Sequence, residues 1–75
     1  MAQDERAMSL GEQRVRATFN PNGDATVNEI KAKAAALIDL CEGLKKKDGR
    51  LAALAQTSFE EGAMWAVKAA TTGLP

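Results

Sequence analysis

The side chains of this 75-residue chain that could do chemistry are few and mostly charged. There is no histidine, and Cys41 is the only cysteine. Nucleophilic catalysis needs a matched base, so acid–base work would fall to carboxylates or lysines. Hydrolysis by paired carboxylates needs a cleft that a helical hairpin hardly offers. No metal or phosphate-loop motif occurs. We therefore expect a protein that is not an enzyme and that uses no cofactor or metal.

The overall charge excludes some partners. Ten basic and ten acidic side chains cancel, so no general field attracts duplex nucleic acid or an anionic membrane. No apolar run approaches the roughly 20 residues of a membrane span, and the first residues lack the apolar core of a secretory signal. The lone Cys41, expected to be buried, suits a reducing compartment. These observations predict a cytoplasmic protein in which a few local charges could hold a small anion.

Two aromatic side chains, Phe19 and Trp65, and one lysine, Lys31, are candidates for ligand contact. Phe19 directly precedes a turn, and Lys31 follows early in the first predicted long helix. Phe19 could anchor the N-terminal arm to the hairpin, or it could stack on a base if a basic or polar companion lies close. Lys31 could be an ordinary solvent-facing lysine or a phosphate contact. Trp65 is expected to lie in the core or at a subunit contact.

The elements that position these residues are helical. The segment Asn20-Pro21-Asn22-Gly23 has the residues favoured in a type I turn. Asp24 and Thr26 follow as candidate caps, and Thr26 with Glu29 has the form of a capping box. A first helix from there to Lys45–Lys47 would stop at Gly49. A second helix would run back antiparallel from about Arg50 to Thr72, closed by Gly73 and Pro75.

The predicted fold is therefore all-α, with a short N-terminal arm or helix in residues 1–18 and a helical hairpin in residues 19–75. Residues 4–17 could form a helix interrupted near Gly11, or a disordered or partner-docked arm. Apolar residues of the first helix follow a heptad-type seam of Val27, Ile30, Ala34, Leu37, Cys41 and Leu44. The second helix shows a stripe of Leu51, Ala55, Phe59, Gly62, Ala66 and Ala69.

Further apolar residues of the second helix lie off that stripe, namely Leu54, Met64, Trp65 and Val67. A surface helix normally has one apolar stripe, so this helix needs more partners than its hairpin can supply. Domains this small are marginally stable without disulfides, metals or self-association. Since the chain has one cysteine, we expect a compact homo-oligomer.

Several blocks of the sequence resemble the phage anti-CBASS and Thoeris anti-defence proteins that sequester cyclic-nucleotide immune signals. The resemblance covers residues 19–72 and rests on the blocks FNP (19–21), NEIKAK (28–33), ALID (36–39), LAQT (54–57) and AMWAVKAAT (63–71). It implies a non-enzymatic sponge that forms a compact homohexamer in the cytoplasm of the infected host. It also implies that cyclic dinucleotides are held between protomers, with cyclic trinucleotides or cyclic ADP-ribose isomers as further ligands.

The resemblance also implies site residues. In the family an aromatic near the start of the hairpin stacks on a base beside a polar residue, and a lysine early in the first long helix contributes. Phe19, Asn20 and Lys31 match these positions, with Pro21 in the same segment. The family usually has tyrosine where this chain has Phe19, so stacking is kept and any hydroxyl contact is lost.

Two weaker candidates and one other function stay open. Arg50 and Thr57 match family positions and could belong to a second anion pocket, or they could be a capping arginine and a packed hydroxyl. A different class of function is a small helical interaction module that inhibits or regulates a partner protein through its apolar second helix. Such a module should neither self-associate nor gain thermal stability with cyclic nucleotides.

Overall fold

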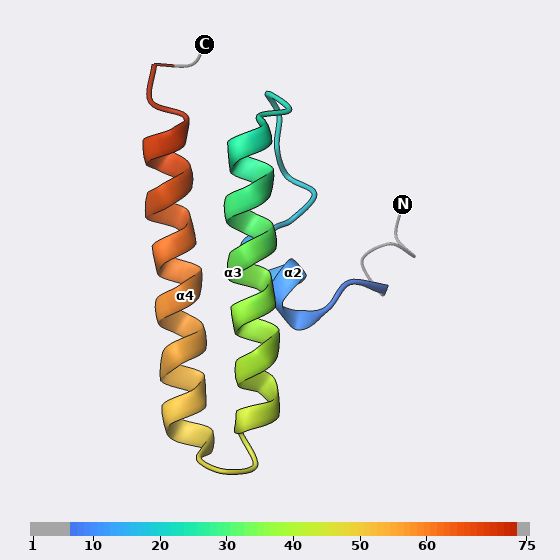
Figure 1. The fold of residues 1–75 in the computed structure, drawn as a ribbon, viewed down its shortest axis with the longest axis vertical. Helices are drawn as coiled ribbons and strands as arrows, with labels where there is room; N and C mark the ends of the chain where they lie inside the picture. The colour runs from blue at the N-terminus through green and yellow to red at the C-terminus, as the bar shows by residue number, and fades with distance from the viewer. Residues whose placement is uncertain (1–6, 74–75) are drawn as a thin grey trace.

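Three helices make up the fold of residues 7–73, the part of the chain that the computed structural model describes. Helix α2 spans Leu10–Val15, α3 spans Ala25–Leu44 and α4 spans Gly49–Ala70, and this part of the chain contains no strand. Helices α3 and α4 lie side by side and antiparallel, and the short α2 packs mainly on α3 (Figure 1). The all-helical hairpin predicted from the sequence is confirmed.

The molecule is a thin plate. Its principal extents are 43 × 29 × 13 Å, and the smallest is little more than the roughly 10–12 Å diameter of one helix with its side chains. In so thin a molecule, side chains are buried only where neighbouring helices meet. The buried cluster is accordingly small and consists of Val15, Ala35, Ile38 and Ala63, with partly buried neighbours such as Phe59 against it.

Side-chain oxygens cap the N-termini of the three helices. Asp24 caps α3 by accepting from the Val27 N–H at 3.0 Å, and Asp48 caps α4 by accepting from the Leu51 N–H at 2.9 Å. The capping box predicted at Thr26 and Glu29 is therefore wrong, because α3 already begins at Ala25. The predicted stop at Gly49 is also wrong, since this glycine is the first residue of α4.

A capping box is present at the start of α2, whereas the sequence predicted one at Thr26 and Glu29. The Ser9 hydroxyl accepts from the Glu12 N–H at 3.1 Å, and the Glu12 carboxylate accepts from the Ser9 N–H at 2.9 Å. The expected interruption near Gly11 lies at Met8 and Ser9, just before α2 begins at Leu10, and α2 runs through Gly11 itself. Residues 4–6 of that expected helix, and Pro75 at the other end, lie outside the described residues.

The buried face of α3 differs from the predicted seam. Val27 and Cys41 of that seam are buried, as predicted, but Leu37 is 42% exposed. The other buried residues, namely Lys31, Ala35 and Ile38, lie outside the seam. The reason is that α2 also packs on α3, with Gly11 against the Ala35 backbone. Burial is therefore centred on Ala35 and Ile38, between two neighbours, rather than on a seam that faces one.

Small and polar residues line the buried face of α4. Ala52, Gln56 and Ala63 are buried, while Leu51 from the predicted stripe is exposed. The Gln56 Nε2 donates to the Ile38 carbonyl at 3.0 Å and to the Glu42 carboxylate at 2.8 Å. The hydrogen bond from Gln56 lowers the pKa of Glu42. An amide in the α3–α4 interface thus joins the two helices where the sequence pattern predicted only apolar contact.

None of the helices in the described range is both long and apolar enough to cross a membrane.

Candidate functional site

The segment between α2 and α3 is held in place by Lys31. This side chain extends from α3 and is only 6% exposed. Its Nζ donates to the Arg16 carbonyl at 2.8 Å and also to the Phe19 carbonyl. An ammonium group has three donors, so two of them are engaged in fixing the backbone that carries Phe19. Burial, and then the nearby Arg16 guanidinium, lower the pKa of Lys31.

Phe19 presents its ring to solvent beside two cations. Phe19 is 57% exposed. The Arg16 Cζ lies 5.2 Å and the Lys31 Nζ 5.5 Å from the ring centroid. An exposed aromatic face can stack on a nucleobase, and cations beside it can meet a phosphate. The basic companion that base stacking requires is therefore present.

Asn20 organises the turn. Its Nδ2 donates to the Asp24 carbonyl and to the Asn28 Oδ1, both at 2.8 Å, and its Oδ1 accepts from the Asp24 N–H at 3.2 Å. Its own carbonyl accepts from the Gly23 N–H at 3.0 Å, which closes the predicted turn. Both amide donors of Asn20 are engaged, so this side chain acts by fixing the turn. Pro21 lies exposed within it.

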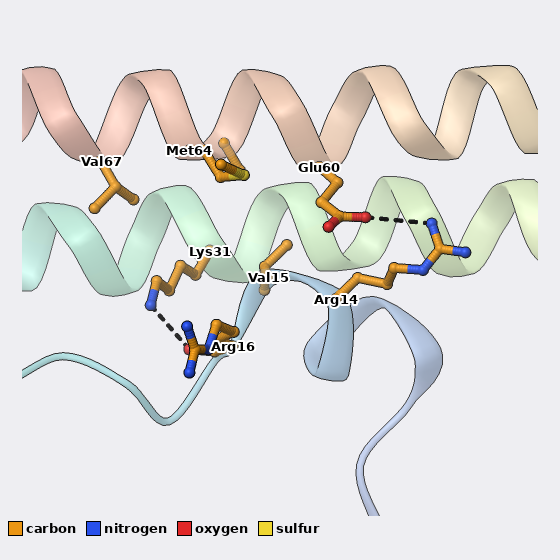
Figure 2. A pocket seen from close by; sticks show the side chains of 8 residues that line it. Arg14, Val15, Arg16, Lys31, Glu60, Met64 and Val67 are labelled. Carbon is orange, nitrogen blue, oxygen red and sulfur yellow. Dashed lines mark hydrogen bonds and ion pairs between the residues drawn. The ribbon is translucent and has the colours of Figure 1, made fainter.

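A pocket of about 380 Å³ adjoins this loop between α2, α3 and α4 (Figure 2). Arg14, Arg16 and Lys31 supply positive charge, and Glu60 supplies the one carboxylate in the lining. The remaining lining is apolar and consists of Val15, Ala63, Met64 and Val67. The Arg14 Nη1 lies 3.3 Å from the Glu60 Oε1, which joins α2 to α4 across the pocket. Cationic and apolar walls together suit a ligand with both phosphates and flat bases.

Arg14 and Arg16 were not predicted from the sequence as site residues. A signal was available, because two arginines precede Phe19 closely in the chain. Their contribution depends on the turn of chain between α2 and α3, which places the Arg16 guanidinium over the ring. Without that conformation the spacing alone does not predict a shared site.

Arg50 and Thr57 lie apart from this site. Both residues are exposed on α4, and Arg50 sits in its first turn. That end of the hairpin is opposite the loop that carries Phe19 (Figure 1). The structure thus brings Phe19, Asn20 and Lys31 together but does not bring Arg50 or Thr57 to them. Within the described residues, no group of three or more metal-ligating side chains gathers.

The fold and this site define a small helical-hairpin domain with an aromatic and cationic surface. The chain belongs to the Acb2/Tad1 hairpin-domain family, whose model matches residues 11–71. This is the family of anti-CBASS and anti-Thoeris sponges, so the family assignment made from the sequence is confirmed. The match begins at Gly11 and therefore includes α2 and both arginines of the pocket. Searches of curated proteins and of solved structures each produced no match.

Proposed function

We propose that this protein is an anti-defence sponge that binds cyclic dinucleotide immune signals and holds them without cleaving them. The observation that carries the proposal is the exposed Phe19 ring with two cations within 5.5 Å of its centroid. The loop that carries this ring is held by the hydrogen bond from the Lys31 Nζ to the Arg16 carbonyl. One base would stack on Phe19, and a phosphate would meet Lys31 or its neighbours. Sequestration in the cytoplasm of an infected host would keep the signal from its effector.

The preorganised loop favours binding. Lys31 and Asn20 hold the backbone on either side of Phe19 through hydrogen bonds of their own. A ring whose backbone is already fixed loses little conformational freedom when a ligand arrives. Base stacking on an aromatic side chain is worth about 1–3 kcal/mol per base. Such a site suits a ligand that must be captured at low concentration.

A thermal-shift and chromatography experiment tests this proposal. Purified protein is mixed with cyclic dinucleotides, cyclic trinucleotides and cyclic ADP-ribose isomers, with linear dinucleotides as the matched control. A ligand at 100 times its dissociation constant should stabilise the protein by about 2.7 kcal/mol. After denaturation, chromatography should recover the cyclic ligand intact. The absence of any shift would overturn the proposal, and catalytic formation of a linear product would replace the sponge with a nuclease.

We also propose that the working form is a homo-oligomer, and specifically a hexamer. The thin plate leaves large apolar side chains exposed on α3 and α4, each between 42% and 66%: Leu37, Leu40, Leu44, Leu51, Leu54, Met64 and Trp65. Large apolar side chains exposed in this number favour an interaction site, because monomeric soluble proteins rarely expose large apolar patches. A symmetric ligand with two bases suits a two-fold interface at which each pocket element occurs twice.

Trp65→Ala should weaken this assembly. Trp65 is 63% exposed in the single chain, and buried tryptophans are frequent interface hot spots that cost about 2 kcal/mol or more when truncated. The subunit dissociation constant should therefore rise about thirtyfold or more. Sedimentation or light scattering at several concentrations measures it, with Phe19→Ala as an exposed-aromatic control that stays oligomeric. A wild-type protein that is a soluble monomer at micromolar concentration, with no ligand response, would favour the interaction module instead.

A further inference from the structure

Arg16 has an unusual backbone conformation. Its φ of 56° and ψ of 58° place it in the left-handed region, and within residues 7–73 no other residue except glycine has a positive φ. Arg16 follows the last residue of α2 and ends it as a Schellman motif. The Arg16 N–H donates to the Gln13 carbonyl at 3.2 Å, and the Ala17 N–H donates to the Glu12 carbonyl at 2.9 Å. Glycine usually occupies this position, because a side chain there is sterically disfavoured.

The same residue contributes to the site with both its backbone and its side chain. Its carbonyl accepts from Lys31, its guanidinium lies 5.2 Å from the centre of the Phe19 ring, and it lines the adjoining pocket. Glycine would end the helix with less strain but would remove the guanidinium. Strained backbone of this kind tends to occur at functional sites. Arginine at a glycine position thus points to a role for its side chain.

Lys31 has little capacity left to donate to a ligand. Two of its three ammonium donors are engaged by the Arg16 and Phe19 carbonyls, and the side chain is almost fully buried. Arg16, by contrast, is exposed. A guanidinium is planar and can meet a phosphate with two parallel N–H groups.

We infer that Arg16 is a ligand-binding residue whose guanidinium meets a phosphate of the nucleotide whose base stacks on Phe19. This inference rests on the proposed function, and it assigns the principal phosphate contact to Arg16 rather than to Lys31. The left-handed backbone goes with a guanidinium that lies over the Phe19 ring, 5.2 Å from its centroid. Base and phosphate of one nucleotide can therefore be held by residues three positions apart on the same loop.

Two substitutions separate the role in binding from the role in folding. Arg16→Gly and Arg16→Ala both remove the guanidinium, but only glycine relieves the left-handed backbone. Calorimetry with an adenine-only cyclic dinucleotide should show about a tenfold or greater loss of affinity for both variants. In the absence of ligand and at equal protein concentration, Arg16→Gly should melt about 4–8 °C above Arg16→Ala. Arg16→Lys should recover part of the affinity, since it keeps the charge without the planar fork.

The outcomes distinguish this inference from the proposed function. Wild-type protein that binds cyclic dinucleotides, together with Arg16→Gly and Arg16→Ala variants that bind equally well, would overturn the inference and leave the sponge intact. Tighter binding by both variants would also overturn it, because the guanidinium would then be competing with the base for Phe19. Wild-type protein that binds none of the cyclic nucleotides would overturn the proposed function itself. Equal melting temperatures for the glycine and alanine variants would contradict the argument from backbone strain.

Discussion

Replacing Gly11 by alanine is expected to displace α2 from α3. A Cβ at this position would lie 2.1 Å from the Ala35 carbonyl oxygen and 2.8 Å from the Ala35 Cα. These are backbone atoms within a helix, so they cannot rotate aside as a side chain would. Separation of the helices would also break the hydrogen bond from the Gly11 N–H to the Asp39 carboxylate, which is 2.7 Å long. The overpacking should cost at least about 1–3 kcal/mol of folding free energy.

Thermal and denaturant unfolding measure this effect, with Gly43→Ala as the matched control. Gly43 lies within α3, and a Cβ there would meet nothing within 4 Å. Alanine should stabilise that exposed helical position by about 0.5–1 kcal/mol. The two variants should therefore change stability in opposite directions. A Gly11→Ala protein that unfolds like the wild type would contradict the close packing of α2 on α3.

Gly11→Ala should also reduce ligand affinity, although Gly11 does not line the pocket. Helix α2 carries Arg14 and leads directly into Arg16, and both arginines line it. Displacing α2 would move both cations relative to Lys31. The variant therefore tests whether the position of α2 determines the geometry of the site.

Replacing Lys31 by methionine is expected to lower affinity for cyclic dinucleotides by about one to two orders of magnitude. Two effects combine. A positive charge near the phosphate is lost, and the carbonyls of Arg16 and Phe19 lose their shared donor. The variant should still fold, because methionine has a similar length and the cost of burying a charge disappears. Calorimetry measures the affinity, and circular dichroism confirms the helices.

Lys33→Met is the matched control for Lys31→Met. Lys33 is on the same helix and is exposed, and its Nζ lies 3.4 Å from the Glu29 carboxylate in a surface pair. Such pairs contribute little, so this variant should bind with nearly wild-type affinity. Unchanged affinity for Lys31→Met would place the ligand elsewhere, with the Arg50 and Thr57 end of the hairpin as the next candidate.

The pH dependence of binding provides a second readout for Lys31. Its pKa is lowered from 10.5 by burial and by Arg16. The protonated form is the one that attracts a phosphate, so affinity should fall as the pH rises through the lowered pKa. Wild-type affinity for an adenine-only cyclic dinucleotide should therefore decline at a lower pH than an unperturbed lysine would predict. Lys31→Met should not show this decline.

Local signals in the sequence were sufficient to predict much of the architecture. Turn residues between Asn20 and Gly23, the break around Asp48 and long alanine-rich segments indicate a helical hairpin without reference to distant contacts. The same signals, with the family resemblance, selected Phe19 and Lys31, which the structure places beside each other. Caps were harder to assign, since Asp24 and Thr26 compete for one helix end and only the folded backbone shows that Asp24 caps it.

Tertiary packing decided which faces are buried and what the site contains. Gly11 could be recognised as a contact point only once Ala35 was opposite it, because a missing side chain leaves no pattern of its own. That contact places α2 on α3. Because α4 packs on another side of α3, the buried residues of α3 differ from a seam that faces a single helix. It also turns an ordinary-looking lysine into a buried residue that organises a loop. The left-handed backbone of Arg16 could not be predicted from the sequence either, because glycine is the usual residue at that position after a helix.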